Sequence, residues 1–181
     1  TKFIPWRISL AILSVSFYAF WDYRFLPLIF IVTVVDFFAA RIIESTNKTI
    51  YKKIAIGLSI GINLSFLIFF KYILLFLDGL EASFGYVYPG GILHSIILPL
   101  GISFYTFEAI SYVIDVYRGE KKAEQSYLSY MLFILFFPKL IAGPIMRAGM
   151  LLPQLQKRPK VTHKDLKVGL NTILNGLFLK V

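Results

Sequence analysis

The chain has 181 residues, of which 57% are hydrophobic and 16% charged, and its formal net charge is +9. Soluble domains carry about 25% charged residues, so this composition, with a mean hydropathy of +0.72, indicates apolar segments of a membrane protein. The Lys and Arg residues collect in short polar stretches between the apolar runs, which argues against a nucleic-acid-binding face. There is no cysteine, which excludes a disulfide framework and a thiolate metal site.

Two apolar segments open the chain, at residues 3–20 and 25–40. A helix needs about 17–25 residues to cross the hydrocarbon core of a bilayer, so we expect both to be short or tilted spans. The turn between them contains Trp21 and Tyr23, and these side chains favour the membrane interface. The sequence therefore predicts a helical hairpin whose tip lies at the headgroups.

A basic loop follows at residues 41–53, and a third apolar segment follows it at residues 54–77. The loop's positive charge predicts that it lies on the cytoplasmic side. The third segment contains Gly57 and Gly61, a spacing that lets two helices approach closely. Glycine is also common in membrane helices, so the pattern has two equally good interpretations.

The loop at residues 78–94 contains no Lys or Arg, which predicts an external position. A fourth apolar segment is expected at residues 96–114, followed by a charged turn at residues 115–122. This turn falls on the cytoplasmic side if the fourth segment crosses the membrane.

The fifth segment, residues 127–146, is interrupted by Pro138 and by Gly143-Pro144. Interior proline removes a helix hydrogen bond and kinks or ends the helix. The following stretch, residues 147–167, is strongly basic, and a complete crossing would place it outside, against the positive-inside tendency. We therefore expect this segment to be broken or re-entrant. A last apolar segment begins at residue 168.

Polar residues of the fourth segment share one helix face, because Glu108, Tyr112 and Asp115 follow at spacings of three and four. An acid within a span usually faces the bundle interior or a cavity. Glu108 therefore either lines a substrate cavity or forms a structural pair with Lys71 or Lys139, and pairing is slightly favoured.

Three further groups have weaker signals. Asp36 lies about one turn from the basic loop, which favours a structural pair with a base there. Lys139 would bind an anionic group or cap broken backbone. His94 and His163 have no partner at a spacing that suggests a triad or a metal site, so we expect neither catalysis nor metal binding from them.

Two groups of long motifs follow each other in the chain. The first is LPLGISFYTFE at residues 98–108, SY at 111–112 and IDVYRG at 114–119, and the second is FPKLIAGPI at 137–145, Arg147 and PQL at 153–155. These motifs resemble those of the bacterial membrane-bound O-acyltransferases, and FYA at residues 17–19 with Trp21 resembles the early part of the family pattern. The motifs fall in the family's order, and the resemblance covers most of the chain.

The resemblance implies an all-α fold, a polytopic transmembrane helix bundle around a tunnel with a broken or re-entrant segment, in the bacterial inner membrane. Residues 1–181 would form a partial domain of five to six hydrophobic segments. The family's catalytic histidine would lie beyond Val181, and neither His94 nor His163 matches it, so no catalytic residue is expected in this chain. The family's first N-terminal span would also be missing.

The implied function is transfer of an acyl group, acetyl by the nearest resemblance, to hydroxyls of a cell-surface polysaccharide such as alginate. The donor, acetyl-CoA or another acyl carrier, would act as a substrate on the cytoplasmic side, with no bound cofactor or metal. The implied partners are the lipid bilayer and a periplasmic or extracellular modification protein, and no nucleic acid. The candidates for the cavity or substrate path are Glu108, Tyr112, Asp115, Arg118, Lys139, Pro144 and Arg147.

Three alternatives stay open. A transporter or channel also contains broken helices and intramembrane acids, but it often has paired repeats, and the break at residues 138–144 has no earlier counterpart. The D-alanyl transfer protein of teichoic acid modification is a more distant relative of the same family. A non-catalytic scaffold that recruits a periplasmic partner is the third.

Overall fold

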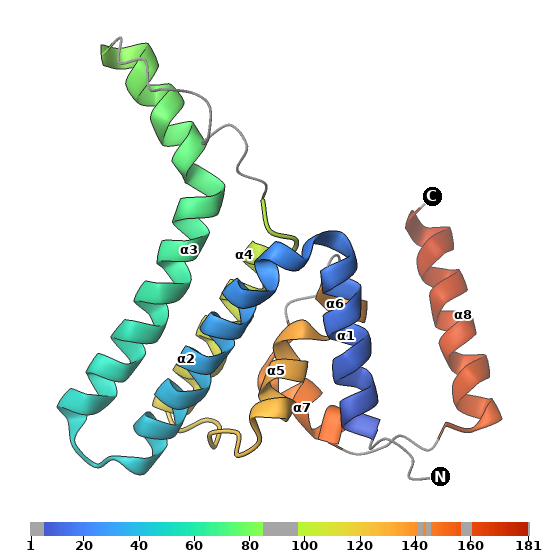
Figure 1. The fold of residues 1–181 in the computed structure, drawn as a ribbon. Helices are drawn as coiled ribbons and strands as arrows, with labels where there is room; N and C mark the ends of the chain where they lie inside the picture. The colour runs from blue at the N-terminus through green and yellow to red at the C-terminus, as the bar shows by residue number, and fades with distance from the viewer. Residues whose placement is uncertain (1–5, 85–97, 141–142, 144–145, 157–160, 181) are drawn as a thin grey trace.

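The computed structural model describes residues 6–84, 98–140, 143, 146–156 and 161–180, and this part of the chain contains helices and no strand. The all-α prediction is confirmed. Figure 1 shows the arrangement: α2, α3 and α4 lie side by side, α5 lies between α4 and α1, and α8 stands apart.

The first predicted hairpin forms, with shifted boundaries. Helix α1 spans Trp6–Asp22 and α2 spans Leu26–Ser45, joined by a short 3-10 helix, η1, at Tyr23–Phe25. The carboxylate of Asp22 accepts the backbone N–H of Arg24 at 2.9 Å and pairs with its guanidinium, which fixes the turn. Pro27 lies in the first turn of α2, where its missing N–H is harmless.

Helix α3 spans Thr49–Phe84 and is longer at both ends than predicted, so the basic loop shrinks to three residues. Much of the expected loop is helical. Arg, Lys and Glu favour the helical conformation even where their side chains are exposed to solvent. A Cβ built on Gly57 or Gly61 would have no heavy atom within 4 Å, so no helix of the described chain packs closely there.

Helix α4 spans Ile102–Tyr117 and begins later than predicted from hydrophobicity. Gly101, the residue before the helix, has a φ of 70°, a left-handed conformation that glycine adopts readily, and its carbonyl accepts the first helical bond, from the Tyr105 N–H. Most of the loop predicted at residues 78–94, with His94, lies outside the described residues.

The predicted break in the fifth segment is confirmed. Helix α5 spans Tyr127–Leu135, a single turn α6 spans Phe137–Leu140, and α7 spans Ala148–Gln156. Phe136 leaves the helical conformation, with φ −56° and ψ 103°, and Pro138 follows directly. Helix α8 spans His163–Lys180, and all of its described side chains are exposed.

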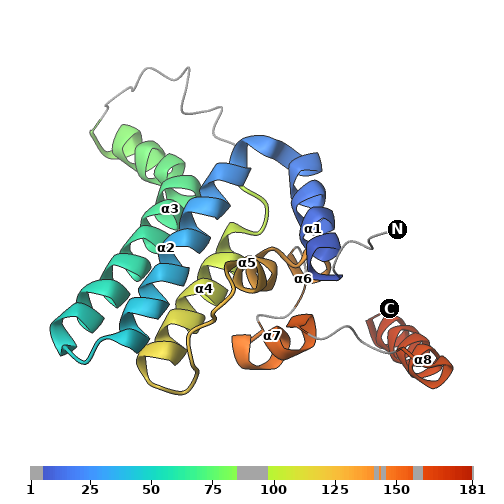
Figure 2. The same ribbon diagram turned by 60° about the horizontal axis from the view of Figure 1, so that its bottom comes forward.

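The core lies around α5, where seven consecutive residues from Ser129 to Leu135 are buried. This short helix packs against α1, α2, α4 and α7, and Figure 2 shows it in their midst. Many large apolar side chains on the outer faces of α1, α3 and α8 are exposed. Two continuous helical stretches, Trp6–Ser45 (bent at η1) and Thr49–Ile73, are long and apolar enough to cross a membrane by length and composition alone.

Candidate functional site

The polar face predicted for α4 exists and points into the bundle. Tyr105, Glu108, Tyr112 and Asp115 are all buried, whereas Phe104 and Phe107 are exposed. The helical spacing of three and four places these polar groups in one row. The row runs from the turn at Gly101 to the charged loop after Tyr117.

Glu108 is the centre of the site. Its Oε2 pairs with the Lys139 ammonium at 2.5 Å, and its Oε1 accepts the backbone N–H of Met146 at 3.1 Å. Both side chains of the ion pair are at most 6% exposed. Of the two bases considered from sequence, Lys139 rather than Lys71 is therefore the partner. The ammonium also lies 4.2 Å from the ring centroid of Phe133, a favourable cation–π contact.

The backbone around this pair is tightly folded, and we call the unit of Phe136–Leu140, Gly143 and Met146 the elbow. The Gly143 N–H bonds to the Lys139 carbonyl at 3.0 Å, and a Cβ on Gly143 would lie 2.6 Å from Lys139 Cα. A Cβ on Gly101 would lie 2.7 Å from the Leu140 carbonyl oxygen. Real Cβ atoms do not approach so closely, so glycine is required at both positions. Pro144 lies outside the described residues.

After the elbow the chain returns to the end of the bundle from which α5 starts. Arg147 lies 3.8 Å from Glu120, in the loop after α4, and Gln156 at the end of α7 donates to Glu124 at 2.8 Å. The Glu124 N–H in turn donates to the Tyr112 hydroxyl at 2.8 Å. Ser126, directly before α5, also donates its N–H to Glu124 at 3.3 Å, so residues on both sides of the broken segment lie against the same loop.

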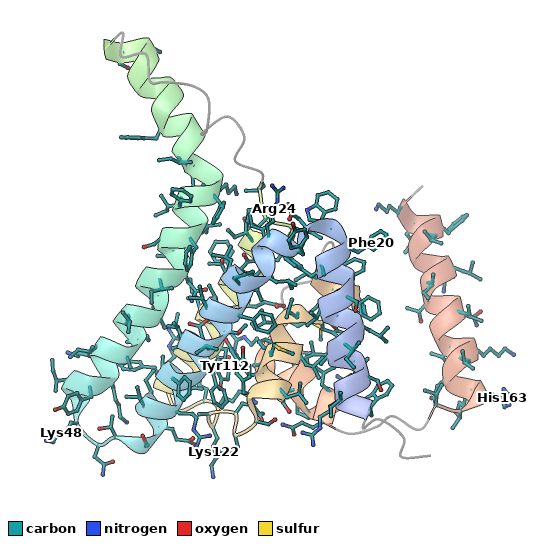
Figure 3. The ribbon with its side chains drawn as sticks, viewed as in Figure 1. Phe20, Arg24, Lys48, Tyr112, Lys122 and His163 are labelled. Carbon is teal, nitrogen blue, oxygen red and sulfur yellow. The ribbon has the colours of Figure 1, made fainter. Side chains whose placement is uncertain are left out.

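The other predicted residues fall into a second group at this end. Arg118 and Arg147 both approach Glu120, while the backbone carbonyl of Asp115 accepts the N–H groups of Glu120 and Lys121. The structure thus joins Glu108 with Lys139, and separately Arg118 with Arg147. His163 begins α8, away from Tyr112 (Figure 3). No cluster of metal ligands occurs among the described residues.

Asp36 has different partners from those expected. It is fully buried and accepts hydrogen bonds from Ser59 Oγ at 2.5 Å and Asn63 Nδ2 at 2.9 Å, both on α3. Asp36 thus has a structural role, as expected, but its partners are neutral polar groups of α3 and not a base of the following loop. The signal that was missed is the spacing of Ser59 and Asn63, which places two polar groups on one face of an apolar helix.

An apolar cavity of about 680 Å³ lies beside the elbow. Leu13, Ser16, Phe17, Phe20, Trp21, Leu100 and Phe137 line it. Phe137 belongs to the elbow, and its ring lies 5.7 Å from that of Phe17 on α1. None of the described candidate residues lines this cavity, so the polar row of α4 and the cavity are separate features.

Neither family models nor solved structures match the chain. Curated relatives do. The chain is 32% identical over 97% of its length to the peptidoglycan O-acetyltransferase of Helicobacter pylori, of which it covers 38%. It is 38% identical to the probable alginate O-acetylases AlgI of Azotobacter vinelandii and Pseudomonas aeruginosa, over 93% and 97% of its length, and covers 34% of each.

The chain therefore spans about a third of the length of these relatives. The likeness extends along almost the whole chain, so it includes the α4 row, the elbow and α7. Together with the motifs at residues 98–119 and 137–155, it shows that the chain belongs to the membrane-bound O-acyltransferase family, as a part of such a protein.

Proposed function

We propose that the intact protein transfers an acyl group, acetyl by likeness, from a cytoplasmic donor to hydroxyls of a cell-surface polysaccharide. The observation that carries this proposal is the identity of 32–38% along at least 93% of the chain to proteins named as polysaccharide O-acetylating enzymes. One of those names specifies peptidoglycan and another alginate, so the acceptor is proposed only as a polysaccharide.

The proposed setting is the bacterial inner membrane, with the described helices as part of a polytopic bundle. Two helical stretches of sufficient length and composition support it, as do the exposed apolar faces. Figure 3 shows Lys48 and Lys122 at one end of the bundle and Phe20 with Arg24 at the other. Because Lys and Arg favour the cytoplasmic side, we assign the end with Lys48 and Lys122 to the cytoplasm.

In this setting the broken segment is re-entrant: it enters from the cytoplasmic end as α5, turns at the elbow and returns ahead of Arg147, so that α7 lies at the cytoplasmic end. Irregular backbone at membrane depth is stable only where protein or a water-filled passage surrounds it. The Glu108–Lys139 pair and its bond to the Met146 amide would fix the elbow as one wall of the acyl passage. These residues are positioning residues, and the catalytic histidine implied by the family would come from elsewhere in the intact protein.

The donor proposed is acetyl-CoA or another acyl carrier, acting as substrate. A periplasmic or extracellular modification protein is the proposed partner on the opposite side. Within the family, transfer of D-alanine to teichoic acid is the second candidate. The two differ in the acyl group that reaches the polymer, and mass spectrometry distinguishes an acetyl ester from an alanyl ester.

The test uses a strain from which the gene for the intact protein has been deleted. We expect its cell-surface polysaccharide to lose O-acetyl esters, and the wild-type gene to restore them. An E108A variant should restore few, whereas E44Q, at an exposed acid outside the elbow, should restore them fully. Unchanged ester content in the deletion strain would contradict the proposed function.

A further inference from the structure

Three hydroxyl groups inside the bundle have no hydrogen-bond partner among the described residues. They belong to Ser14 and Tyr18 on α1 and to Tyr105 on α4. Ser14 and Tyr18 are fully buried, and Tyr105 is 1% exposed. A buried hydroxyl without a partner loses its hydration and gains nothing in return, so native proteins pair almost all such groups. Three of them in one region therefore indicate a bound polar ligand.

The two hydroxyls of α1 face the broken segment. Ser14 and Tyr18 are four residues apart, so they lie on one face of the helix, and a tyrosine side chain in a helix extends over the preceding turn. This face is buried where α1 packs against α5 and α6 (Figure 2). Phe17, the neighbour of Tyr18, has its ring 5.7 Å from that of Phe137 in the elbow. The two hydroxyls therefore lie close to the elbow.

The third hydroxyl reaches the same region from α4. Gly101, Tyr105 and Glu108 follow at spacings of four and three, so they share one face of the chain. Gly101 lies against the elbow at one end of this row, and Glu108 binds Lys139 of the elbow at the other. Tyr105, between them, faces the elbow as well. Its phenol is close enough to that of Tyr18 for the two to interact electrostatically.

Burial and chemistry together restrict the ligand. The described part of the chain already covers all three side chains, so neither a substrate nor a helix from elsewhere in the intact protein can reach their hydroxyls. A water molecule is small enough, and it both donates and accepts hydrogen bonds, as a hydroxyl does. Water commonly bridges polar groups that lie too far apart to bond directly. A buried water molecule typically has about three protein partners, which is the number present here.

We propose that the hydroxyls of Ser14, Tyr18 and Tyr105 bind internal water, which bridges α1 to α4 beside the elbow. Such water joins the two helices through hydrogen bonds that their own side chains do not reach. In a bilayer no bulk solvent can replace it, so the bridge stabilises α1 against the broken segment. The site requires no acyl transfer, so a failure of the proposed function leaves it standing.

Brief X-ray irradiation of the intact protein in nanodiscs tests for this water directly. Radiolysis converts bound water into hydroxyl radicals, which oxidise the side chains that they touch, and mass spectrometry locates the oxidised residues. Tyr18 and Tyr105 should be labelled several times faster than Tyr112. Tyr112 is the matched control, because it is equally buried but its hydroxyl accepts the Glu124 N–H. Labelling of Tyr18 and Tyr105 no faster than that of Tyr112 would overturn the site.

Removal of single hydroxyls gives a second test. Y18F and Y105F should each raise the equilibrium constant of unfolding about fivefold, the usual scale for the loss of one hydrogen bond. If the hydroxyls are unpaired instead, each variant should be as stable as the wild type or more stable, because a buried donor without a partner has been removed. That result would overturn the site. Y23F, at an exposed tyrosine, is the control and should change the constant less than about twofold.

The double variant and the labelling together separate water from a direct contact. Y18F/Y105F should change the unfolding constant by less than the product of the two single changes, because both hydroxyls bind the same water. A direct hydrogen bond between the two hydroxyls would give the same coupling without fast labelling, and would overturn the site. The labelling comparison uses the wild-type protein, so it stands even if a variant fails to fold.

Discussion

Glu108 connects parts of the chain that are distant in sequence. Its carboxylate binds the Lys139 side chain and the Met146 backbone while almost wholly buried in the bundle. A buried ion pair is weak evidence of added stability, since desolvation offsets its attraction. Its consequence is geometric: Lys139 and the Met146 amide are held at fixed positions against α4.

Removal of one partner should expose this role. We expect E108A to destabilise the folded protein by about 3–5 kcal/mol, because Lys139 is left buried and unpaired. The double variant E108L/K139M should be less destabilised than E108A, since no charge is then unpaired. Unfolding in detergent checks this, with E44A as the control, which should cost under about 0.5 kcal/mol. A double variant as unstable as the single one would contradict the account.

The two glycines of the elbow region are a second residue-scale feature. G101A should cost about 1–3 kcal/mol, because its φ of 70° is unfavourable for a side chain and its Cβ would meet the Leu140 carbonyl. G143A should destabilise for the second reason alone, since its Cβ would meet the Lys139 backbone. G149A is the matched control: its Cβ has open space in a helix, so it should be neutral or slightly stabilising. Similar melting temperatures for all three variants would refute this.

At the scale of elements, α2 and α3 are joined by the buried polar contact of Asp36 with Ser59 and Asn63. In a membrane such contacts bind helices that have no hydrophobic drive to associate. D36L should destabilise the pairing by about 1–3 kcal/mol for each partner left without a hydrogen bond. D36L/S59A/N63L should recover most of that loss. Equal destabilisation of the single and triple variants would indicate a role other than helix pairing.

Helix α8 begins with a reciprocal cap. The Asp165 carboxylate accepts the hydroxyl and the N–H of Thr162, at 2.6 and 2.9 Å, and the Thr162 hydroxyl accepts the Asp165 N–H. Hydrogen bonds from the Thr162 side chain, then from its backbone, lower the pKa of Asp165 from its ordinary value. The stabilisation is therefore fully present above the ordinary carboxyl pKa, about 3.9, and is lost as the pH falls through the lowered pKa.

This cap gives a pH-dependent prediction. Amide hydrogen exchange at residues 163–167, corrected for the intrinsic rate, should show constant protection from pH 7 to 5 and less below the ordinary pKa. T162V should reduce protection at pH 7 and flatten this pH dependence. T172V, at another exposed threonine of α8, is the control and should leave the pH dependence intact. Identical profiles for T162V and the wild type would show that the cap does not hold the helix start.

The sequence predicted an element boundary well where the residue itself restricts the backbone. Pro138 and the following glycine predicted the break, because proline removes a donor wherever it lies. The start of α4 was misplaced by six residues, since hydrophobicity at residues 96–101 does not reveal the left-handed conformation of Gly101. The choice of Lys139 over Lys71 was not predictable, because it depends on which helices become neighbours. The spacing of Ser59 and Asn63 indicates a polar face on α3, but not that Asp36 lies against it.

At the scale of the whole molecule, the conflict between the basic stretch after residue 146 and the positive-inside tendency has a structural resolution. The contacts of Arg147 with Glu120 and of Gln156 with Glu124 return the chain to the loop after α4. Among the described residues, Lys48, Lys122 and Arg147 then share one end of the bundle. The sequence pattern of charge and the three-dimensional arrangement therefore agree only if the fifth segment does not cross.

The most direct test of this re-entrant arrangement is single-cysteine labelling in the intact protein in cells, with a reagent that does not cross membranes. The chain has no cysteine of its own, and with any cysteine elsewhere in the intact protein replaced by serine, Q125C, G149C and Y23C each report one place. We predict that Q125C and G149C, on either side of the broken segment, react only from the cytoplasm, and that Y23C reacts only from outside. Labelling of G149C from the side opposite to Q125C would show that the segment crosses, and would contradict the account.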